Sequence, residues 1–334
     1  NNPGAPVSIF FTVRNEEENL WKQLPTLLQI RGVEFEVIVV DDYSQDNSLS
    51  VLGLLNQRYK HLRISSLSQE TRFSVKLAQN VALKSATNDW VMQIPVSINE
   101  INEDWLKQFS EKIDNSKKLV IAYSSVVSKK GLYNMLFRIE NFFQYVKSAG
   151  YISNRISFVY SEENLAFNKK NYFDLNGYGS KVKEPFANLE LIINSFIRKN
   201  ATSLIFNRET SIFKNVEVGH SEYFDLLKKS FRIENHLPWW KQLILNIDKL
   251  IQLIFLPLVI TVFIVIQGLW PVFISLLSIY LIAYLLIIKI ALNRLNERKI
   301  FIPSLVYGLI MPYFILFYRW HFANKLRRKW KNKV

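Results

Sequence analysis

Two short apolar runs that flank a segment of helical periodicity limit the folds open to this chain more than any other feature. Residues 7–13 and 36–40 are rich in β-branched and aromatic side chains, which favour strands. Between the two runs, leucines recur at the spacing of one helix face, namely Leu20, Leu24, Leu27 and Leu28. A strand, a helix and a strand in this order predict two parallel strands joined by a right-handed crossover.

An acidic pair, Asp41 and Asp42, follows the second predicted strand directly. In open α/β sheets, ligands bind outside the carboxyl ends of the strands. Two carboxylates would be costly in a protein core, so we expect this pair to face a binding cleft. The alternative is that both aspartates only cap the following turn through side-chain hydrogen bonds.

The strand VSIFFTV, the tripeptide Arg14-Asn15-Glu16 and the segment VIVVDDYSQD resemble glycosyltransferase family 2. The resemblance implies a GT-A domain, which is an α/β, Rossmann-like fold with a mostly parallel sheet. It also implies that this end of the domain binds the base and ribose of a nucleotide. The residues that match the nucleotide-binding positions are Thr12, Asn15, Glu16, Asp41 and Asp42.

A second block, SVKLAQNVALKSATNDW, resembles the family's next helix and strand. Its apolar residues predict a helix face made of Val75, Ala78, Val81, Ala82 and Ala86. Lys76 matches a basic position that the family places near the phosphates. The alternative for Lys76 is a solvated helix end.

The family expects the motif Asp-x-Asp at the end of the strand that follows, where two carboxylates hold Mg²⁺ or Mn²⁺. This chain has Pro95, Val96 and Ser97 instead. Magnesium requires hard oxygen ligands, usually carboxylates together with phosphate and water. We therefore expect no dedicated metal site, although the resemblance implies that cofactor.

A third block, residues 163–178, keeps the spacing of the family's acceptor-side motif but lacks its first glycine. The family then has an acidic pair, one member of which deprotonates the acceptor hydroxyl. Ala187 and Asn188 stand there, and neither side chain can take a proton. Glu190 is the remaining candidate for a general base, with a carboxylate on an ordinary helix face as the alternative. Before this block, residues 119–127 predict one strand.

Two apolar runs that are nearly free of charge, 250–269 and 272–290, are each long enough to cross a bilayer. A third run, 300–318, contains Pro303, Gly308 and Pro312. The sequence thus predicts a glycosyltransferase-like domain over 1–222 and an interfacial amphipathic segment over 223–248. Membrane helices follow over 249–320, with a basic tail over 321–334.

The net charge of +14 is concentrated in the last part of the chain. Residues 241–334 contain 13 Lys and Arg but only two acidic residues, Asp248 and Glu297. Basic residues beside apolar segments are typical of the cytoplasmic flanks of membrane proteins, so nucleic-acid binding is disfavoured. Two spans would return the chain to the cytoplasm at residues 294–299. We therefore expect 300–318 to be re-entrant, or a tilted hairpin broken at 308–312.

Two functions remain open. The first is an enzyme of the bacterial inner membrane whose cytoplasmic domain takes a nucleotide sugar, UDP-type by resemblance. It would transfer the sugar, with inversion, to a lipid-linked or membrane-proximal acceptor. The second is an inactive family member that serves as a subunit or regulator of a membrane complex with a protein partner, because the metal and base positions have changed. A transporter is disfavoured, since the apolar runs carry no buried charge pair or repeat.

Overall fold

The computed structural model describes residues 4–331 apart from 72, 115, 198–199 and 266–269, with side chains as far as residue 321. The contacts divide the chain into two compact units, Asn1–Ile233 and Glu234–Val334. The strands of the first unit are β1 (Val7–Val13), β2 (Phe35–Asp41), β3 (Leu62–Ser66), β4 (Trp90–Gln93), β5 (Leu119–Ile121), β6 (Ser124–Val126), β7 (Leu165–Asn168), β8 (Thr202–Leu204) and β9 (Ile212–Lys214). Its helices are α1 (Glu17–Leu28), α2 (Ser48–Arg58), α3 (Ser74–Ser85), α4 (Trp105–Glu111), α5 (Leu132–Ser153), α6 (Lys170–Phe173), the 3-10 helix η1 (Gly179–Lys183), α7 (Leu189–Phe196) and α8 (His220–Asn235), whose last residues enter the second unit.

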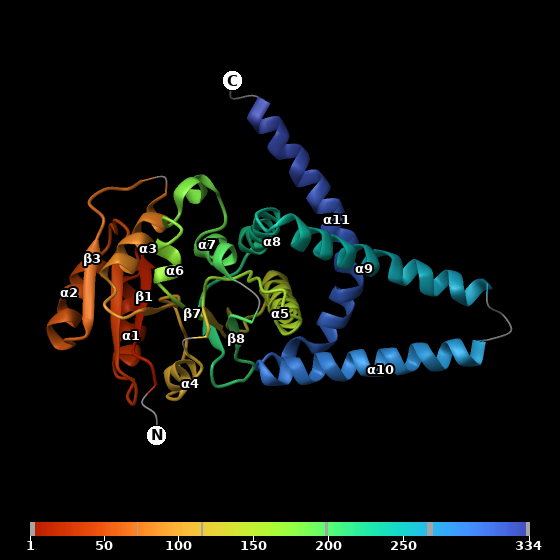
Figure 1. Cartoon of the computed structure of the whole chain (residues 1–334), viewed down its shortest axis with the longest axis horizontal. Coiled ribbons are helices and arrows are strands. Elements are labelled where there is room, and N and C mark those ends of the chain that lie inside the picture. Colours follow the sequence, from red (N-terminus) through yellow and green to blue (C-terminus); the bar gives the residue numbers. More distant parts are fainter. Residues whose placement is uncertain (1–3, 72, 115, 198–199, 266–269, 332–334) are drawn as a thin grey trace. The chain divides into compact units, whose positions relative to one another are not determined.

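A seven-stranded sheet in the order β3-β2-β1-β4-β7-β5-β8 forms the centre of the first unit (Figure 1). Strands β1, β2, β3 and β4 are parallel, while β7 runs antiparallel to both of its neighbours. The mostly parallel α/β sheet expected from the sequence is confirmed. Val13 is paired with Asp41 across β1 and β2, so the loops that follow these strands leave the same edge.

The first crossover forms as predicted because its apolar face has a core to cover. All four leucines of α1 that define the predicted face are buried. They pack with Val7, Ile9 and Val37 in one apolar cluster. Removing such side chains from water stabilises the unit by roughly 1.5–3 kcal/mol each.

The predicted single strand over 119–127 is instead divided between two sheets. β5 pairs with β7 and β8, whereas β6 leaves this sheet and pairs with β9. Ala122 and Tyr123 form the junction, and both are buried. The apolar run could not reveal the change because both parts are equally buried. The helix α8 likewise continues through residue 222, where the sequence suggested that the first domain would end.

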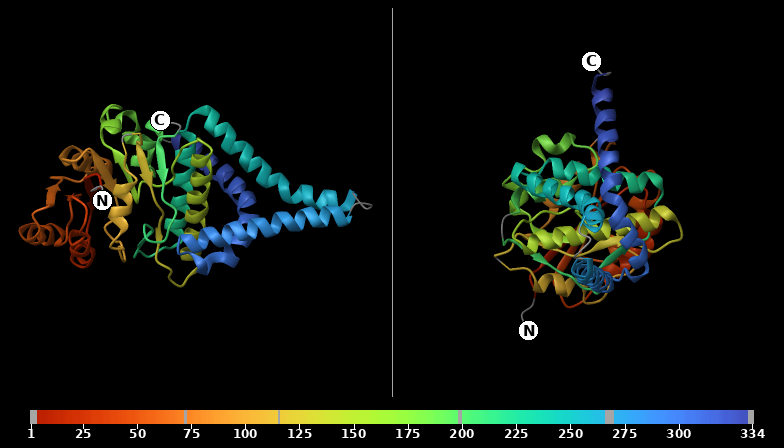
Figure 2. Two further views of the ribbon diagram at one scale, coloured as in Figure 1. Left: turned by 60° about the horizontal axis from the view of Figure 1, so that its bottom comes forward. Right: turned by 90° about the vertical axis from the view of Figure 1, so that its right-hand side faces the viewer.

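The second unit contains α9 (Trp239–Val265), α10 (Trp270–Arg294), the short 3-10 helix η3 (Arg298–Ile300) and α11 (Phe301–Lys331). Three helical segments are long and apolar enough to cross a membrane. The end of the predicted span 250–269 lies outside the described residues, because 266–269 are among those not described. The predicted break at 308–312 is wrong, since α11 continues through Pro312 (Figures 1 and 2).

Candidate functional site

The first part of the candidate site lies where β1 and β2 end. The loop after β1 and the loop after β2 are joined by hydrogen bonds from backbone amides to side chains. The Asn15 amide donates to the Ser44 hydroxyl (2.9 Å), and the Gln45 amide donates to the Asn15 side-chain oxygen (2.7 Å). The Glu16 amide donates to the Ser48 hydroxyl (2.9 Å). Asn15 and Glu16 therefore hold the two loops together.

Asp41 and Asp42 have different surroundings, although both are buried. Oδ2 of Asp41 accepts a hydrogen bond from the Ser44 amide (3.1 Å), which is the turn-capping role expected as an alternative. Burial raises the pKa of Asp42, while a hydrogen bond from Ser74 at the start of α3 and the charge of Arg14 oppose that rise. Thr12, on β1, is half-buried and paired with Val40.

One carboxylate oxygen of each aspartate lacks a partner. Within the described part of the chain, Oδ1 of Asp41 and Oδ1 of Asp42 are buried and have no hydrogen bond. A buried acceptor without a donor costs about 1–3 kcal/mol. These two atoms are therefore unsatisfied acceptors at this edge of the sheet.

Lys76 is neither solvated nor open to a ligand in this structure. Its amine donates to the backbone carbonyls of Lys181 (3.2 Å), Val182 (3.2 Å) and Glu184. Burial lowers the pKa of Lys76, against the opposing charges of Glu184, Glu190 and Glu162. Lys76 thus fastens the segment that contains η1 to α3, while its neighbour Val75 is exposed.

Replacing Lys76 with methionine should therefore loosen the segment 181–184. The carbonyls of Val182 and Glu184 would lose the Lys76 amine, whereas that of Lys181 keeps the Glu184 amide (3.1 Å). One unsatisfied buried group costs about 1–3 kcal/mol. Hydrogen exchange at 181–184 should become faster and the thermal midpoint should fall. The control is Lys22→Met, because Lys22 forms only an exposed pair with Glu18. If Lys76→Met weakened nucleotide binding without changing the exchange at 181–184, Lys76 would instead act on the phosphates.

The end of β4, where the family has its metal ligands, is largely apolar. Pro95 and Val96 line a small cavity with Phe11 and Leu24. Ser97 is buried, and its carbonyl accepts a hydrogen bond from the Asn215 amide (2.7 Å). Among the described residues, no group of three or more His, Asp or Glu side chains is placed to hold a metal ion. The residues at this strand end do not fit Mg²⁺ or Mn²⁺.

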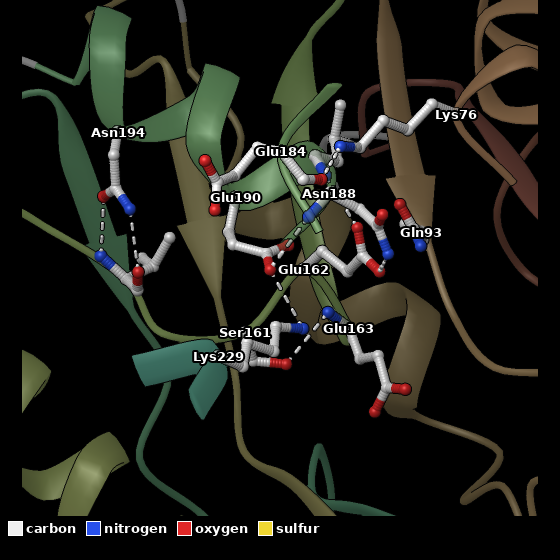
Figure 3. Close-up of polar contacts among 12 residues, drawn as sticks. Lys76, Gln93, Ser161, Glu162, Glu163, Glu184, Asn188, Glu190, Asn194 and Lys229 are labelled. Atoms are coloured by element: carbon white, nitrogen blue, oxygen red, sulfur yellow. Dashed lines mark hydrogen bonds and ion pairs between the residues drawn. The ribbon is translucent and has the colours of Figure 1, made fainter. Parts of the chain in front are cut away.

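Glu162 is a buried carboxylate that the sequence did not single out (Figure 3). It accepts hydrogen bonds from the Leu189 amide (2.8 Å), the Asn188 side chain (3.2 Å) and Gln79 (3.2 Å). Gln79 in turn contacts Gln93 at the end of β4 (3.3 Å). Glu162 therefore connects the start of α7 to the end of β4. A glutamate where the family has its glycine was the available sequence signal.

Glu190, the predicted base candidate, lies fully buried in the first turn of α7. Its Oε1 accepts a hydrogen bond from the Asn188 amide (3.1 Å) and forms an ion pair with Lys229 of α8 (3.1 Å; Figure 3). Its Oε2 has no hydrogen-bond partner within the described residues. Burial raises the pKa of Glu190 to about 7, although Lys229 opposes the rise. A carboxylate with this pKa can exchange a proton near neutral pH.

The structure thus contains two groups of polar residues. Asp41 and Asp42 lie where β1 and β2 end, beside the start of α3. Glu162, Glu190 and Lys229 cluster around the start of α7. Lys76 belongs to the second group by its contacts, not to the first. No sequence spacing could have placed Lys229 against Glu190, because they lie on different helices.

Comparison with known proteins places this geometry in a family. Residues 8–173 match the family model described as glycosyl transferase family 2. The mannosyltransferase PcManGT from Pyrobaculum calidifontis, solved with GDP-Man and Mn²⁺, is 16% identical with a TM-score of 0.52, and the match covers 92% of this chain and 88% of that one. The match to a TarS fragment (1–349) from S. aureus, solved with UDP-GlcNAc, has 19% identity and a TM-score of 0.48; it covers 70% of this chain and spans only 66% of that fragment.

The likeness to PcManGT, at 16% identity, shows a shared fold and nothing further. The match to the family also covers β1, β2 and the acidic pair, which form the first part of the candidate site. The chain therefore carries a glycosyl transferase family 2 domain.

Proposed function

We propose that this chain binds a nucleotide sugar at the edge of the sheet where β1 and β2 end. The observation that carries the proposal is the pair of buried oxygens of Asp41 and Asp42 that lack donors within the described residues. Ribose hydroxyls and the N–H groups of a base are donors of the required kind. The proposed sugar donor, which is the ligand bound here, is a nucleoside-diphosphate sugar, of the UDP type by the family resemblance.

We further propose that the sugar passes, with inversion, to a lipid-linked or membrane-proximal acceptor. The apolar helices of the second unit support an acceptor at the membrane. In this reaction an acceptor hydroxyl oxygen forms a bond to the anomeric carbon, and the bond from that carbon to the diphosphate breaks. Glu190 takes the hydroxyl proton on Oε2, while Lys229 and the Asn188 amide hold Oε1. The domain then faces the cytoplasm, where nucleotide sugars are made.

A second candidate function is nucleotide binding without transfer, in a subunit or regulator of a membrane complex. It is favoured by Pro95 and Ser97 at the metal positions and by Asn188 at the base position. Losing a metal's charge stabilisation costs several kcal/mol of transition-state binding. Both candidates require the nucleotide site, and they differ only in turnover.

The deciding experiment measures binding and turnover separately on the full chain in lipid nanodiscs. Calorimetry with UDP and GDP tests the nucleotide site. Incubation with UDP-sugars and GDP-sugars in bacterial lipid extract, followed by detection of glycosylated lipid, tests transfer. Binding with transfer supports the enzyme, and binding without transfer supports the second candidate. Failure to bind either nucleotide would refute both.

Nucleotide binding should not depend on a divalent cation. The residues at the end of β4 offer no carboxylates, so a metal would gain little protein coordination. The dissociation constant of UDP should therefore agree within about threefold in Mn²⁺ and in EDTA, which corresponds to less than about 1 kcal/mol. A tenfold or greater dependence on Mn²⁺ would mean that other carboxylates, such as Glu100 or Asp104, supply a metal site.

A further inference from the structure

The two helices α9 and α10 form an antiparallel hairpin. Phe263 and Trp270 stack with ring centroids 5.2 Å apart, and Phe255 lies 5.3 Å from Tyr280. From the first ring pair to the second, the residue number falls in α9, from 263 to 255, and rises in α10, from 270 to 280. The two helices are therefore antiparallel. The ends of the hairpin away from Trp270 are the start of α9 and the end of α10.

Charged residues mark that end of the hairpin as the membrane boundary. In α9, Asp248 and Lys249 immediately precede an uncharged stretch that continues to the end of the helix. In α10, the uncharged stretch ends at Lys289, and Arg294 follows. Twenty residues of helix are needed to cross the hydrocarbon core, which is about 30 Å thick. The uncharged stretches 250–265 in α9 and 270–288 in α10 come nearest to this length if the boundary lies at residues 249 and 289, because any other placement would bring charges into the hydrocarbon core or shorten the span.

The helix α11 stays beside this charged end instead of following the hairpin across the membrane. From Phe301 to Arg319 a helix rises about 27 Å, which would almost cross the hydrocarbon core. Arg319 nevertheless donates a hydrogen bond to Asn235 (3.1 Å) and lies 3.8 Å from Glu234, both before the start of α9. The Tyr313 hydroxyl donates to the carbonyl of Leu253 (2.9 Å), just inside the boundary.

The two views of the second unit agree with these contacts. In Figure 1, α11 passes across α10 and α9, and in the right-hand view of Figure 2, where the hairpin is seen nearly end-on, α11 runs across it. A third span would lie along the hairpin, with Arg319 close to Trp270. The contacts of Arg319 and Tyr313 exclude that arrangement for this structure.

One face of α11 packs inside the unit and the opposite face is apolar and open. The buried positions of α11 are Ser304, Tyr307 and Met311. The exposed face lies opposite and includes Ile302, Val306, Leu309, Ile310, Tyr313, Leu316, Phe317 and Trp320. No acidic residue follows Glu297, while seven Lys and Arg occur from Arg319 to the end of the chain. An apolar face next to a basic tail is complementary to the acyl chains and anionic headgroups of a leaflet.

We propose that α11 lies in the plane of one membrane interface, with its exposed apolar face against lipid acyl chains. The chain then has two membrane spans, α9 and α10. Its basic tail remains on the same side of the membrane as Arg294, Arg298 and Lys299, in contact with anionic headgroups. This inference concerns the membrane unit and does not depend on the proposed transfer reaction.

Spin labels on the exposed face of α11 test the proposal, because the chain contains no native cysteine. The variants are Ile302→Cys, Leu309→Cys and Leu316→Cys in liposomes containing phosphatidylglycerol. Power saturation with oxygen and with a nickel chelate then reports the depth of each label. An in-plane helix should place the three labels at similar depth and in contact with lipid. Steps of about 10 Å from one label to the next, as a spanning helix requires, would overturn the proposal. So would labels shielded from lipid-dissolved oxygen, since another protein would then cover the face.

A labelling experiment on sealed vesicles tests the side on which the tail lies. Asn324→Cys reports the tail, Asn296→Cys reports the loop after α10, and Gln267→Cys reports the connection between α9 and α10. An impermeant maleimide should label Asn324→Cys together with Asn296→Cys, and Gln267→Cys only after the vesicles are opened or inverted. Labelling of Asn324→Cys together with Gln267→Cys would establish a third span and refute the proposal.

Discussion

Substituting alanine for Asp42 is expected to weaken the binding of a nucleoside diphosphate by roughly 10- to 150-fold. Asp42 is buried, yet one of its oxygens has no donor among the described residues. A hydrogen bond to a charged group contributes about 1.5–3 kcal/mol, so its loss weakens binding by roughly 10- to 150-fold. Calorimetric titration of the wild type and of Asp42→Ala with UDP and GDP measures this difference.

The neighbouring aspartate provides a matched comparison. Asp41 caps the turn by accepting a hydrogen bond from the Ser44 amide, and asparagine can accept the same bond. Asp41→Asn should therefore retain the loop structure but replace the unpaired Oδ1 with an amide nitrogen, so its affinity for the nucleotide should also fall while the turn stays intact. Equal affinity in the wild type and in Asp42→Ala would show that Asp42 has no role in nucleotide binding.

The stability of Asp42→Asn distinguishes a binding role from a structural one. Burial raises the pKa of Asp42, so the folded state favours the neutral carboxyl group. The aspartate's contribution to stability is therefore lost as pH rises from its ordinary pKa through the raised value. At neutral pH, asparagine removes this cost, and the thermal midpoint should stay the same or rise. If Asp42 instead stabilised the fold, the thermal midpoint of Asp42→Asn would be lower than that of the wild type.

The first crossover could be predicted because each of its signals is local. The leucines of α1 form one helical face. The strands 7–13 and 36–40 are runs of apolar β-branched and aromatic residues, interrupted only by the polar Ser8, Thr12 and Glu36, which suits burial on both sides of a parallel sheet. The position of Asp41 and Asp42 could be predicted as well, because they stand where the second strand ends. The fold signal and the proposed nucleotide site thus come from one stretch of sequence.

The second part of the site could not be predicted because it depends on contacts between distant segments. Lys76 was expected at the phosphates or in solvent, but carbonyls of the segment 181–184 bind its amine. In the same helix, the predicted apolar face included Val75, which is exposed. Glu162 has no periodicity that relates it to Asn188 or Leu189. Such polar networks become visible only when the elements have packed.

The helix α11 shows why proline and glycine in an apolar segment are poor predictors of a break in the helix. Proline in a helix removes one backbone hydrogen bond and costs about 3 kcal/mol in water. Breaking this apolar helix would leave further backbone groups without partners, which is more costly where its exposed face meets lipid acyl chains. The helix therefore continues through Pro312, and the predicted hairpin does not form.

Replacing Glu190 with glutamine is expected to slow sugar transfer by about 10²–10⁴-fold, the usual contribution of a general base. Glutamine keeps the size of the side chain but cannot take the acceptor proton. The dissociation constant of the nucleotide should change little, since Asp41 and Asp42 form a separate part of the site. Exposed Glu209 supplies the control Glu209→Gln, which should retain wild-type turnover. Loss of turnover together with loss of nucleotide affinity would indicate a structural defect instead.

The pH dependence of turnover identifies the base independently of the rate itself. Burial raises the pKa of Glu190 to about 7, and only the ionised form accepts a proton. Turnover should therefore increase with pH and level off above about pH 7. Lys229 opposes the rise in the pKa of Glu190, so Lys229→Met should move the midpoint of the pH profile upward while nucleotide affinity is retained. If the midpoint stayed in place after Lys229→Met, or if Glu190→Gln retained the profile of the wild type, another group would be the base. Glu190 would then serve only to hold α8 against α7 through its ion pair with Lys229.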